Sequence, residues 1–147
     1  LNFAPSVDVN INPENPVIGK VERSFSAEPS VVTSHAVVVV EEHRKKGIIT
    51  TLKHFPGHGS SKADSHKGLV DVSKTWQANE INPYADLIKQ GKVDMIMTAH
   101  IFNNRLDADV PATLSKRVIT GILRDSLKYQ GVVISDDMQM GAIADHY

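Results

Sequence analysis

Four apolar runs recur along the chain, at residues 1–9, 47–54, 93–100 and 131–136. Each run is short, rich in β-branched side chains and bounded by proline, glycine or charged residues, a pattern typical of buried strands. Between the runs, apolar positions recur at the three-to-four-residue spacing of amphipathic helices. The pattern therefore predicts the element order β-α-β-α-β-α-β.

Proline, glycine and capping residues indicate where the three helices begin and end. Pro29 suits the first turn of the first helix, and Gly47 ends it after three basic residues that match the helix dipole. Valines 37–40 lie inside this segment, whose length favours helix over strand. The bounds predicted for the other two helices are residues 82–91, with Asn82 as N-cap, and residues 115–129.

Polar residues mark the ends of the four predicted strands. They are Asp8, then Lys53 and His54, then His100, then Asp136. Strands that alternate with helices pair in parallel through right-handed crossovers, so their carboxyl ends meet at one edge. An open doubly wound sheet would share this pattern, but residues from several strands on one rim are typical of a barrel. We therefore expect an α/β fold of parallel (β/α) units that forms part of a TIM-type (β/α)8 barrel.

Four strands are about half of such a barrel, and the strands at its open edges lack a neighbour. Nothing in the composition divides residues 1–147 into separate parts, so we expect one contiguous fragment of a barrel domain. Such a fragment needs its missing half, pairs with another copy through the open barrel edges, or is irregular there.

Composition and charge exclude several classes of function. The chain has 147 residues, 41% hydrophobic and 22% charged, which is ordinary for a globular domain. A net charge of −1 provides no basic surface for a phosphate backbone, so no nucleic-acid partner is expected. No apolar stretch is long enough for a membrane segment. Without cysteine there is neither a disulfide nor a thiolate metal site.

The densest group of reactive side chains follows the second strand. Residues 53–59 read Lys-His-Phe-Pro-Gly-His-Gly, and residues 64–66 read Asp-Ser-His. Proline and glycine force a loop here, at the strand end where α/β proteins bind ligands. A zinc site is the competing interpretation, but zinc hydrolases place their histidines at helical spacing, which Pro56 precludes. We therefore expect no metal.

These motifs resemble the signature of glycoside hydrolase family 3, in its β-N-acetylglucosaminidase branch. Segments 2–10, 16–19 and 23–25 are similar to the family's preceding strand and loop, and 133–138 resembles its nucleophile strand. The resemblance runs nearly end to end. It implies that residues 1–147 are a fragment of a catalytic barrel domain of roughly twice this length.

Asp136 is the nucleophile that the resemblance implies. A carboxylate suits this role because it is anionic at neutral pH and its ester with a sugar can be hydrolysed in turn. From the residues alone, a helix N-cap is an equally good interpretation of an aspartate between a strand and a helix. Of the two neighbouring aspartates, Asp137 is the better candidate for that cap.

The resemblance also implies that His66 is the acid/base, assisted by Asp64. An imidazole titrates near neutrality, and a carboxylate on its other nitrogen would fix the tautomer and stabilise the cation. A solvated loop histidine is the alternative. Lys53, His54 and Arg23 would bind sugar hydroxyls, since charged donors form the stronger hydrogen bonds.

Two histidines receive no firm role from the sequence. His58 is expected to be structural, and His100 either lines the sugar pocket or ends its strand. Lys53 and His54 are neighbours, so strict alternation would turn one of them away from the site. We expect the strand to give way to loop there.

The implied activity is that of a retaining exo-β-N-acetylglucosaminidase without a cofactor. Its small-molecule substrates would be cell-wall (muropeptide) fragments or chitin-type oligosaccharides, cleaved through a glycosyl-aspartate intermediate. A phosphorylase, with phosphate in the second step, is the alternative within this chemistry. A non-catalytic carbohydrate-binding fragment is the alternative of another class, and the isolated fragment is expected to be inactive. The compartment is open: bacterial cytoplasm, or periplasm or exterior if a signal peptide precedes Leu1.

Overall fold

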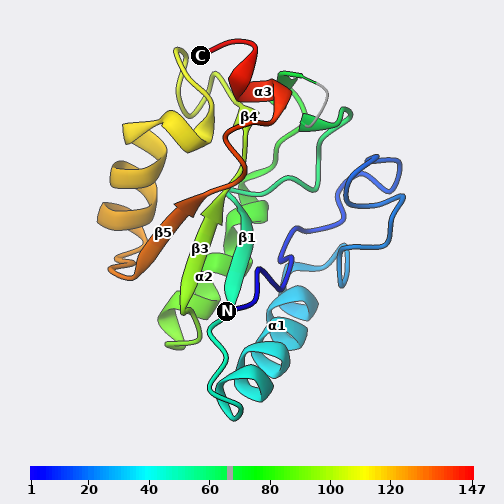
Figure 1. Ribbon diagram of the computed structural model, residues 1–147. Helices are drawn as coiled ribbons and strands as arrows, with labels where there is room; N and C mark the ends of the chain where they lie inside the picture. Colours follow the sequence, from blue (N-terminus) through cyan, green and yellow to red (C-terminus); the bar gives the residue numbers. More distant parts are fainter. Residues whose placement is uncertain (66–67) are drawn as a thin grey trace.

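The computed structural model describes residues 1–65 and 68–147. Its central sheet is parallel and has the strand order β1-β3-β5 (Figure 1). The bounds of these strands are Thr51–Phe55, Met95–Thr98 and Val132–Ser135. Spatial order thus follows chain order, as in a (β/α) barrel, whereas a doubly wound sheet reverses its order at a switch point. The predicted runs 93–100 and 131–136 contain β3 and β5, and the run 47–54 covers β1 except its last residue, Phe55.

The first predicted strand, at residues 1–9, does not form a regular strand. This segment runs parallel to β1 but forms only isolated bridges, between Asn2 and Thr50 and between Ser6 and Lys53. Pro5 has no backbone N–H to contribute to a ladder, which limits pairing in the middle of the segment. Val7 and Val9 near its end are nevertheless fully buried in the core, whereas Leu1 and Phe3 are exposed. The segment therefore occupies the place of a strand next to β1.

A second, small sheet was not predicted. It consists of β2 (Val70–Asp71) and β4 (Ile101–Phe102), which pair in parallel. Two residues are too few for an alternating pattern to be read from the sequence. β4 begins three residues after the end of β3, so this small sheet lies beyond the carboxyl end of the central sheet.

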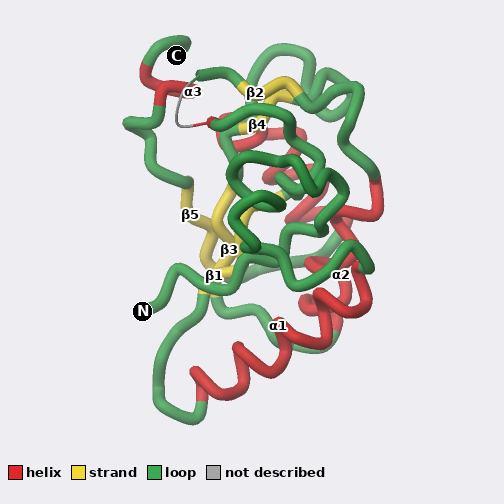
Figure 2. Tube along the Cα trace, turned by 90° about the vertical axis from the view of Figure 1, so that its right-hand side faces the viewer, coloured by secondary structure: helices red, strands yellow, loops and turns green. Residues whose placement is uncertain are grey.

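The first helix matches its prediction closely. α1 (Pro29–Arg44) includes the valine run and buries Val32, Ala36 and Val40 at i, i+4 spacing. Gly47 follows with φ of 67°, the left-handed conformation that ends many helices. α1 packs beside α2 (Asn82–Lys89) (Figure 2).

The start of α2 corrects the expected cap. A 3-10 turn, η2 (Ala78–Ile81), leads directly into α2, so Asn82 is already helical and the N-cap residue is Ile81. The third predicted helix is η4 (Arg117–Ser126), which has π-type hydrogen bonding. Ser115 lies at its start as expected, because the Ser115 hydroxyl accepts a 3.0 Å bond from the Val118 amide. The remaining short elements are the 3-10 turn η3 (Ala112–Leu114) and α3 (Gly141–Ala144).

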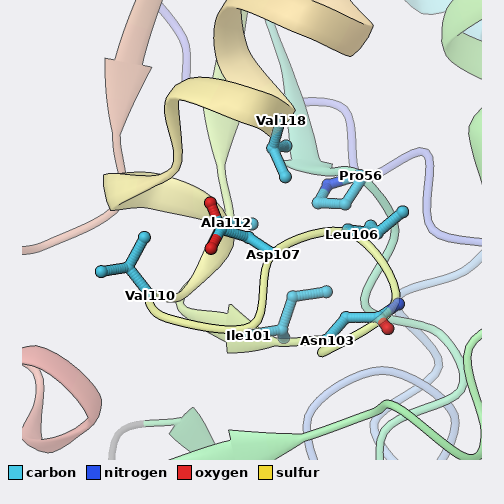
Figure 3. Close-up of a pocket in the computed structure, with 8 residues that line it drawn as sticks. All are labelled: Pro56, Ile101, Asn103, Leu106, Asp107, Val110, Ala112 and Val118. Carbon is cyan, nitrogen blue, oxygen red and sulfur yellow. The ribbon is translucent and has the colours of Figure 1, made fainter.

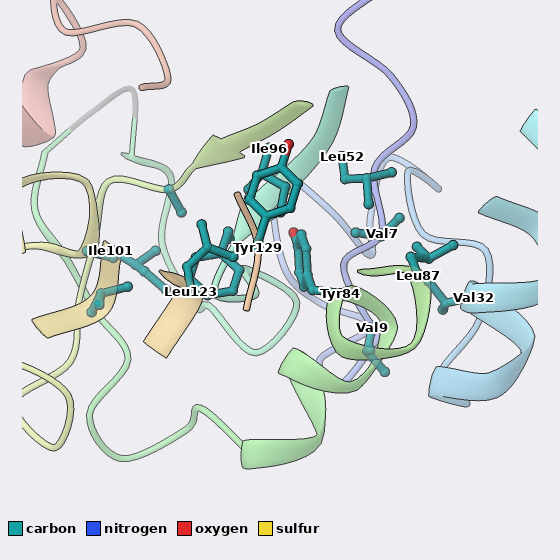
Figure 4. Close-up of a cluster of buried hydrophobic side chains, with 14 of the residues drawn as sticks. Val7, Val9, Val32, Leu52, Tyr84, Leu87, Ile96, Ile101, Leu123 and Tyr129 are labelled. Atoms are coloured by element: carbon teal, nitrogen blue, oxygen red, sulfur yellow. The ribbon is translucent and has the colours of Figure 1, made fainter. Parts of the chain in front are cut away.

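The hydrophobic core lies between the sheet and the helices (Figure 4). Phe55 of β1 packs edge-to-face on Tyr84 of α2, with ring centroids 5.1 Å apart. β5 is less covered than β1 or β3, and Val132 on it is 54% exposed. The sheet edge at β1 is thus covered by packed residues, whereas the edge at β5 is exposed to solvent. In the described part of the chain, no helix has the length and apolarity to cross a membrane.

Candidate active site

The carboxyl ends of β1 and β5 face one pocket. Its lining comes from four separate parts of the sequence: Val17, Ile18, Arg23, His54, His58, Ser65 and Asp136. Three of the predicted site residues, Arg23, His54 and Asp136, are therefore brought together. The pocket lies at the end of the sheet that the sequence predicted.

Asp8 organises the β1 side of this pocket. It is fully buried, and its Oδ2 accepts bonds from His54 Nδ1 at 2.7 Å and from the Ser6 hydroxyl at 2.8 Å. Its Oδ1 accepts from the His58 amide at 2.8 Å. Burial raises the pKa of Asp8, but the charge and hydrogen bond of His54, with help from His58, outweigh it and hold that pKa below its usual value. Asp8 is thus an ionised anchor for two histidines.

His54 and Arg23 form one polar wall of the pocket. His54 Nδ1 donates to the Asp8 carboxylate at 2.7 Å, and its Nε2 lies 3.4 Å from Arg23 Nη2. Arg23 Nη1 also donates to the Val17 carbonyl at 3.0 Å, which keeps the guanidinium in place. A sugar hydroxyl entering the pocket would meet both groups.

His54 lines the pocket, whereas its neighbour Lys53 is not among the lining residues. The predicted change from strand to loop at these two residues is wrong, because β1 continues to Phe55. Instead its pairing register with β3 shifts between Leu52 and Phe55, which breaks strict alternation. Burial, followed by the charge of Arg23, lowers the pKa of Lys53, while the Asp136 carboxylate acts in the opposite direction. The ammonium group therefore lies within electrostatic reach of Asp136.

His58 is held firmly in the loop after β1. It is 3% exposed, and burial lowers its pKa to about 4, so the imidazole is neutral at pH 7. Its carbonyl accepts a 2.7 Å bond from Asn15 Nδ2, and its Nε2 lies 3.4 Å from the Ser65 hydroxyl. Next to it, a Cβ on Gly59 would lie 1.7 Å from the Val9 carbonyl oxygen, so only glycine fits. The imidazole of His58 nevertheless lines the pocket.

Glu80 supports the same loop from behind. Its carboxyl oxygens accept bonds from the Ser60 amide at 3.2 Å and from the Gln77 amide at 3.1 Å. Burial raises the pKa of Glu80 to about 7. Gly57 packs on this side chain, where a Cβ would come within 2.5 Å of Glu80 Cβ. No sequence pattern indicated this role, since Glu80 lies outside every motif.

Asp136 follows β5 and is half-buried at the pocket wall. Its amide donates to the Thr98 carbonyl at 3.2 Å, and its Oδ1 accepts from the Asp137 amide at 2.9 Å. Within residues 1–65 and 68–147, its Oδ2 has no hydrogen-bond partner. Neither aspartate caps the next helix, because α3 has Met140 as N-cap, and Asp137 instead accepts a 2.9 Å bond from the Gln139 amide. The helix-cap prediction for Asp137 is therefore wrong.

His100 lies behind Asp136, and it is not among the residues that line the pocket. It is 1% exposed, its Nδ1 lies 3.0 Å from the Thr113 hydroxyl, and its Nε2 donates to the Asp137 carbonyl at 2.8 Å. Of the two interpretations that the sequence left open, the structural one describes this position.

Of the predicted acid/base pair, Asp64 is described and His66 is not. The role of His66 therefore stays a prediction. Asp64, its predicted partner, is half-buried, and Ser65 reaches the pocket wall. The described chain thus reaches the pocket at Ser65, directly before His66 in the sequence. Among the residues that are described, no three His, Cys, Asp or Glu side chains are grouped to hold a metal ion.

A second cavity, too tightly filled to admit a water molecule, lies under the loop after β4 (Figure 3). Most of its lining is apolar, including Ile101, Leu106 and Val118. Its one carboxylate, Asp107, accepts a 2.6 Å bond from the Ser115 hydroxyl. This cavity holds no group suited to sugar chemistry.

The whole chain, residues 1–147, matches the family model described as the glycosyl hydrolase family 3 N terminal domain. Beta-hexosaminidase A of Pseudoalteromonas piscicida is 42% identical over all of this chain and 27% of that protein. The Beta-hexosaminidase of Tolumonas auensis is 38% identical over all of this chain and 44% of that protein. The chain thus spans less than half the length of these relatives.

Solved structures agree with the sequence comparison. A glycoside hydrolase family 3 beta-N-acetylglucosaminidase from Paenibacillus sp. superposes with a TM-score of 0.92 at 41% identity, over 99% of this chain and 28% of that one. A beta-N-acetylhexosaminidase from Beutenbergia cavernae gives a TM-score of 0.92 at 30% identity, over 99% and 45%. These matches confirm the prediction of parallel (β/α) units from a TIM-type barrel.

Proposed function

The chain belongs to glycosyl hydrolase family 3, and we propose that it supplies the catalytic residues of a retaining exo-β-N-acetylglucosaminidase. The observation that carries this proposal is the position of Asp136: its carboxylate shares one pocket with Arg23 and His54 at the carboxyl ends of β1 and β5. Relatives named beta-hexosaminidase support the sugar class. The proposed substrates are terminal N-acetylglucosamine residues of cell-wall fragments or chitin-type oligosaccharides.

In the first step, Asp136 Oδ2 attacks the anomeric carbon. A C–O ester bond forms, the glycosidic C–O bond breaks, and its electron pair goes to the leaving oxygen. His66 donates a proton to that oxygen, with Asp64 on its other ring nitrogen to stabilise the cation. Because Asp136 Oδ1 is already engaged by the Asp137 amide, Oδ2 is the oxygen available for attack.

In the second step, water attacks the same carbon from the face opposite Asp136. The ester bond breaks, Asp136 recovers its negative charge, and the proton of the water goes to neutral His66. Two inversions leave the configuration of the sugar unchanged. Lys53 balances the recovered negative charge, since Lys53 and Asp136 interact electrostatically.

Arg23, Lys53 and His54 hold the sugar in this scheme. Asp8 fixes the orientation of the His54 ring, so the direction in which Nε2 points is determined before the sugar binds. Preorganised donors and acceptors reduce the entropy that binding must overcome.

The test uses the full-length protein and its Asp136→Asn variant on a β-linked N-acetylglucosamine substrate. We expect a loss of ~10⁴–10⁶-fold in turnover for this variant, as for removal of other enzymic nucleophiles. Asp137→Asn is the matched control and should lose far less. NMR of the first product should show the β anomer, because the reaction retains configuration. An α product, or equal losses in the two variants, would contradict the proposal, and a sugar phosphate formed in phosphate buffer would favour a phosphorylase.

A further inference from the structure

We propose that His100 is a positioning residue that fixes the backbone of the nucleophile loop and thereby the orientation of the Asp136 carboxylate. The inference rests on the proposed function, in which Asp136 is the nucleophile. His100 belongs to the segment after β3 and reaches the loop after β5 from behind, away from the pocket.

The end of β3 holds the nucleophile loop at two points. The Thr98 carbonyl accepts from the Asp136 amide at 3.2 Å, and His100 Nε2 donates to the Asp137 carbonyl at 2.8 Å. Between these two points, the Asp137 amide donates to Asp136 Oδ1 at 2.9 Å. The backbone orientation of Asp137 therefore decides how the nucleophile's carboxylate is turned.

Two threonines hold the His100 ring from its other side. The Asp137 carbonyl can only accept, so His100 Nε2 donates to it, and Nδ1 lies 3.0 Å from the Thr113 hydroxyl. The Thr113 hydroxyl donates to the Ala99 carbonyl at 2.9 Å and lies 2.8 Å from the Thr98 hydroxyl, which donates to the Ile134 carbonyl at 3.3 Å. A chain of hydrogen-bonding side chains thus connects Thr98, Thr113 and His100 to Asp137.

Burial makes this chain effective. Thr98 and His100 are each 1% exposed and Thr113 is 9% exposed, so water competes little for their hydrogen bonds. The loop that they hold has little packing of its own, because Ser135 and Asp137 are exposed and Asp136 is only half-buried. Polar contacts from β3 therefore determine the loop conformation more than apolar contacts do.

The consequence for catalysis is geometric. A misplacement of about 1 Å between reacting groups can lower a rate ~10²-fold. Without the bond from His100, the Asp137 carbonyl keeps only the 3.1 Å bond that the Met140 amide donates from within the loop, and the loop can turn. Asp136 Oδ2 would then no longer be aimed at the anomeric carbon.

A double-mutant experiment in the full-length protein separates positioning from general support. The His100→Leu change is made in the wild-type protein and in Asp136→Ala, where azide replaces the carboxylate as nucleophile and a nitrophenyl N-acetylglucosaminide is the substrate. There the azide nitrogen bonds to the anomeric carbon as nitrophenolate leaves with the electron pair. We expect His100→Leu to lower kcat ~10–10²-fold in the wild-type background. It should leave KM unchanged there, and change the azide-dependent rate of Asp136→Ala less than about twofold.

Conservative variants keep the test decisive. His100→Gln places an amide N–H near the position of Nε2 and should restore most of the rate. If His100→Leu does not fold, Thr113→Val provides the same comparison, because it deletes the hydroxyl that orients the ring.

Equal rate losses in both backgrounds would overturn the positioning role of His100, while Asp136 would keep its role. An Asp136→Ala protein that turns over fully without azide would overturn the proposed function, and with it the role of His100. The two failures are therefore distinguishable.

Discussion

The two sides of the pocket are held in different ways. At the end of β1, residues 54–61 are all buried, and Asp8, Asn15 and Glu80 hold the loop with hydrogen bonds to its backbone. At the end of β5, Asp136 is half-buried, and the hold on its backbone comes from Thr98 and His100. The side that would bind the sugar is rigidly built, whereas the side that would react rests on few contacts.

This difference assigns different consequences to substitutions on the two sides. Changes behind the β1 loop should lower the free energy of unfolding, because they remove buried contacts or leave polar groups unpaired. Changes at Asp136 and its neighbours should lower the rate while the protein stays folded. The predictions below test this separation.

The largest effect on stability is expected for Gly59→Ala. A Cβ there would lie 1.7 Å from the Val9 carbonyl oxygen, and backbone cannot move aside as a flexible side chain can. We expect the variant to lose more than about 4 kcal/mol in free energy of unfolding, measured by urea denaturation. Gly121→Ala is the matched control, because a Cβ at Gly121 meets nothing within 4 Å. A Gly59→Ala protein as stable as this control would show that the loop is not rigidly built.

The next effect concerns rate rather than stability. If His66 protonates the leaving oxygen, His66→Ala should lower turnover ~10²–10⁴-fold with sugar leaving groups. The loss should be far smaller with nitrophenolate, which leaves without a proton. Asp64→Ala should show the same dependence more weakly, since it acts through the imidazole. Equal losses for all leaving groups would remove His66 from the acid position, and a matching loss of stability would contradict the separation of the two sides.

The smallest effect is a pH dependence from Glu80. Its folded-state pKa of about 7 lies above the ordinary value of 4.5, so the folded protein binds more protons than the unfolded protein between these values. Stability should therefore fall as pH rises from about 4.5 to about 7, by about 3 kcal/mol from this group. Urea denaturation of wild type and Glu80→Gln at pH 5 and pH 8 measures the difference. Parallel pH dependence of the two proteins would refute the assignment.

Asp8 should behave in the opposite way. Its folded-state pKa lies below 3.8, so its contribution to stability is present above that pH and is lost as pH falls through the folded-state value. Two buried carboxyl groups behind one loop therefore have opposite signs. The difference arises because the charge and hydrogen bonds of His54 and His58 outweigh burial at Asp8, whereas burial outweighs the hydrogen bonds from Gln77 and Ser60 at Glu80.

Much of the fold could be predicted from the sequence. The runs that predicted β1, β3 and β5 are rich in β-branched residues and bounded by helix- and strand-breaking residues, and α1 lies between a proline and a glycine that suit its ends. The strand prediction for residues 1–9 was wrong because it rested on apolar content, whereas strand pairing also needs backbone N–H groups and Pro5 has none. The cap predicted at Asn82 failed because η2 runs directly into α2, a continuity that no residue pattern signals.

The candidate site was predictable where chemistry and spacing coincide. Lys53, His54 and Asp136 stand at strand ends, which parallel topology brings together. Asp8 was placed on the rim, but its pairing with His54 and His58, 46 and 50 positions away, depends on tertiary structure. The contact of His100 with Asp137 has the same origin.

The measurement that tests the central claim most directly is covalent labelling of the full-length protein. A slow fluorosugar substrate that accumulates the glycosyl-enzyme should place one sugar on the peptide that carries Asp136, located by fragmentation mass spectrometry. The account predicts the label on Asp136, whose Oδ2 is open to the pocket wall, and none in Asp136→Asn. A label on Asp137, or turnover of the substrate with no covalent adduct, would contradict it.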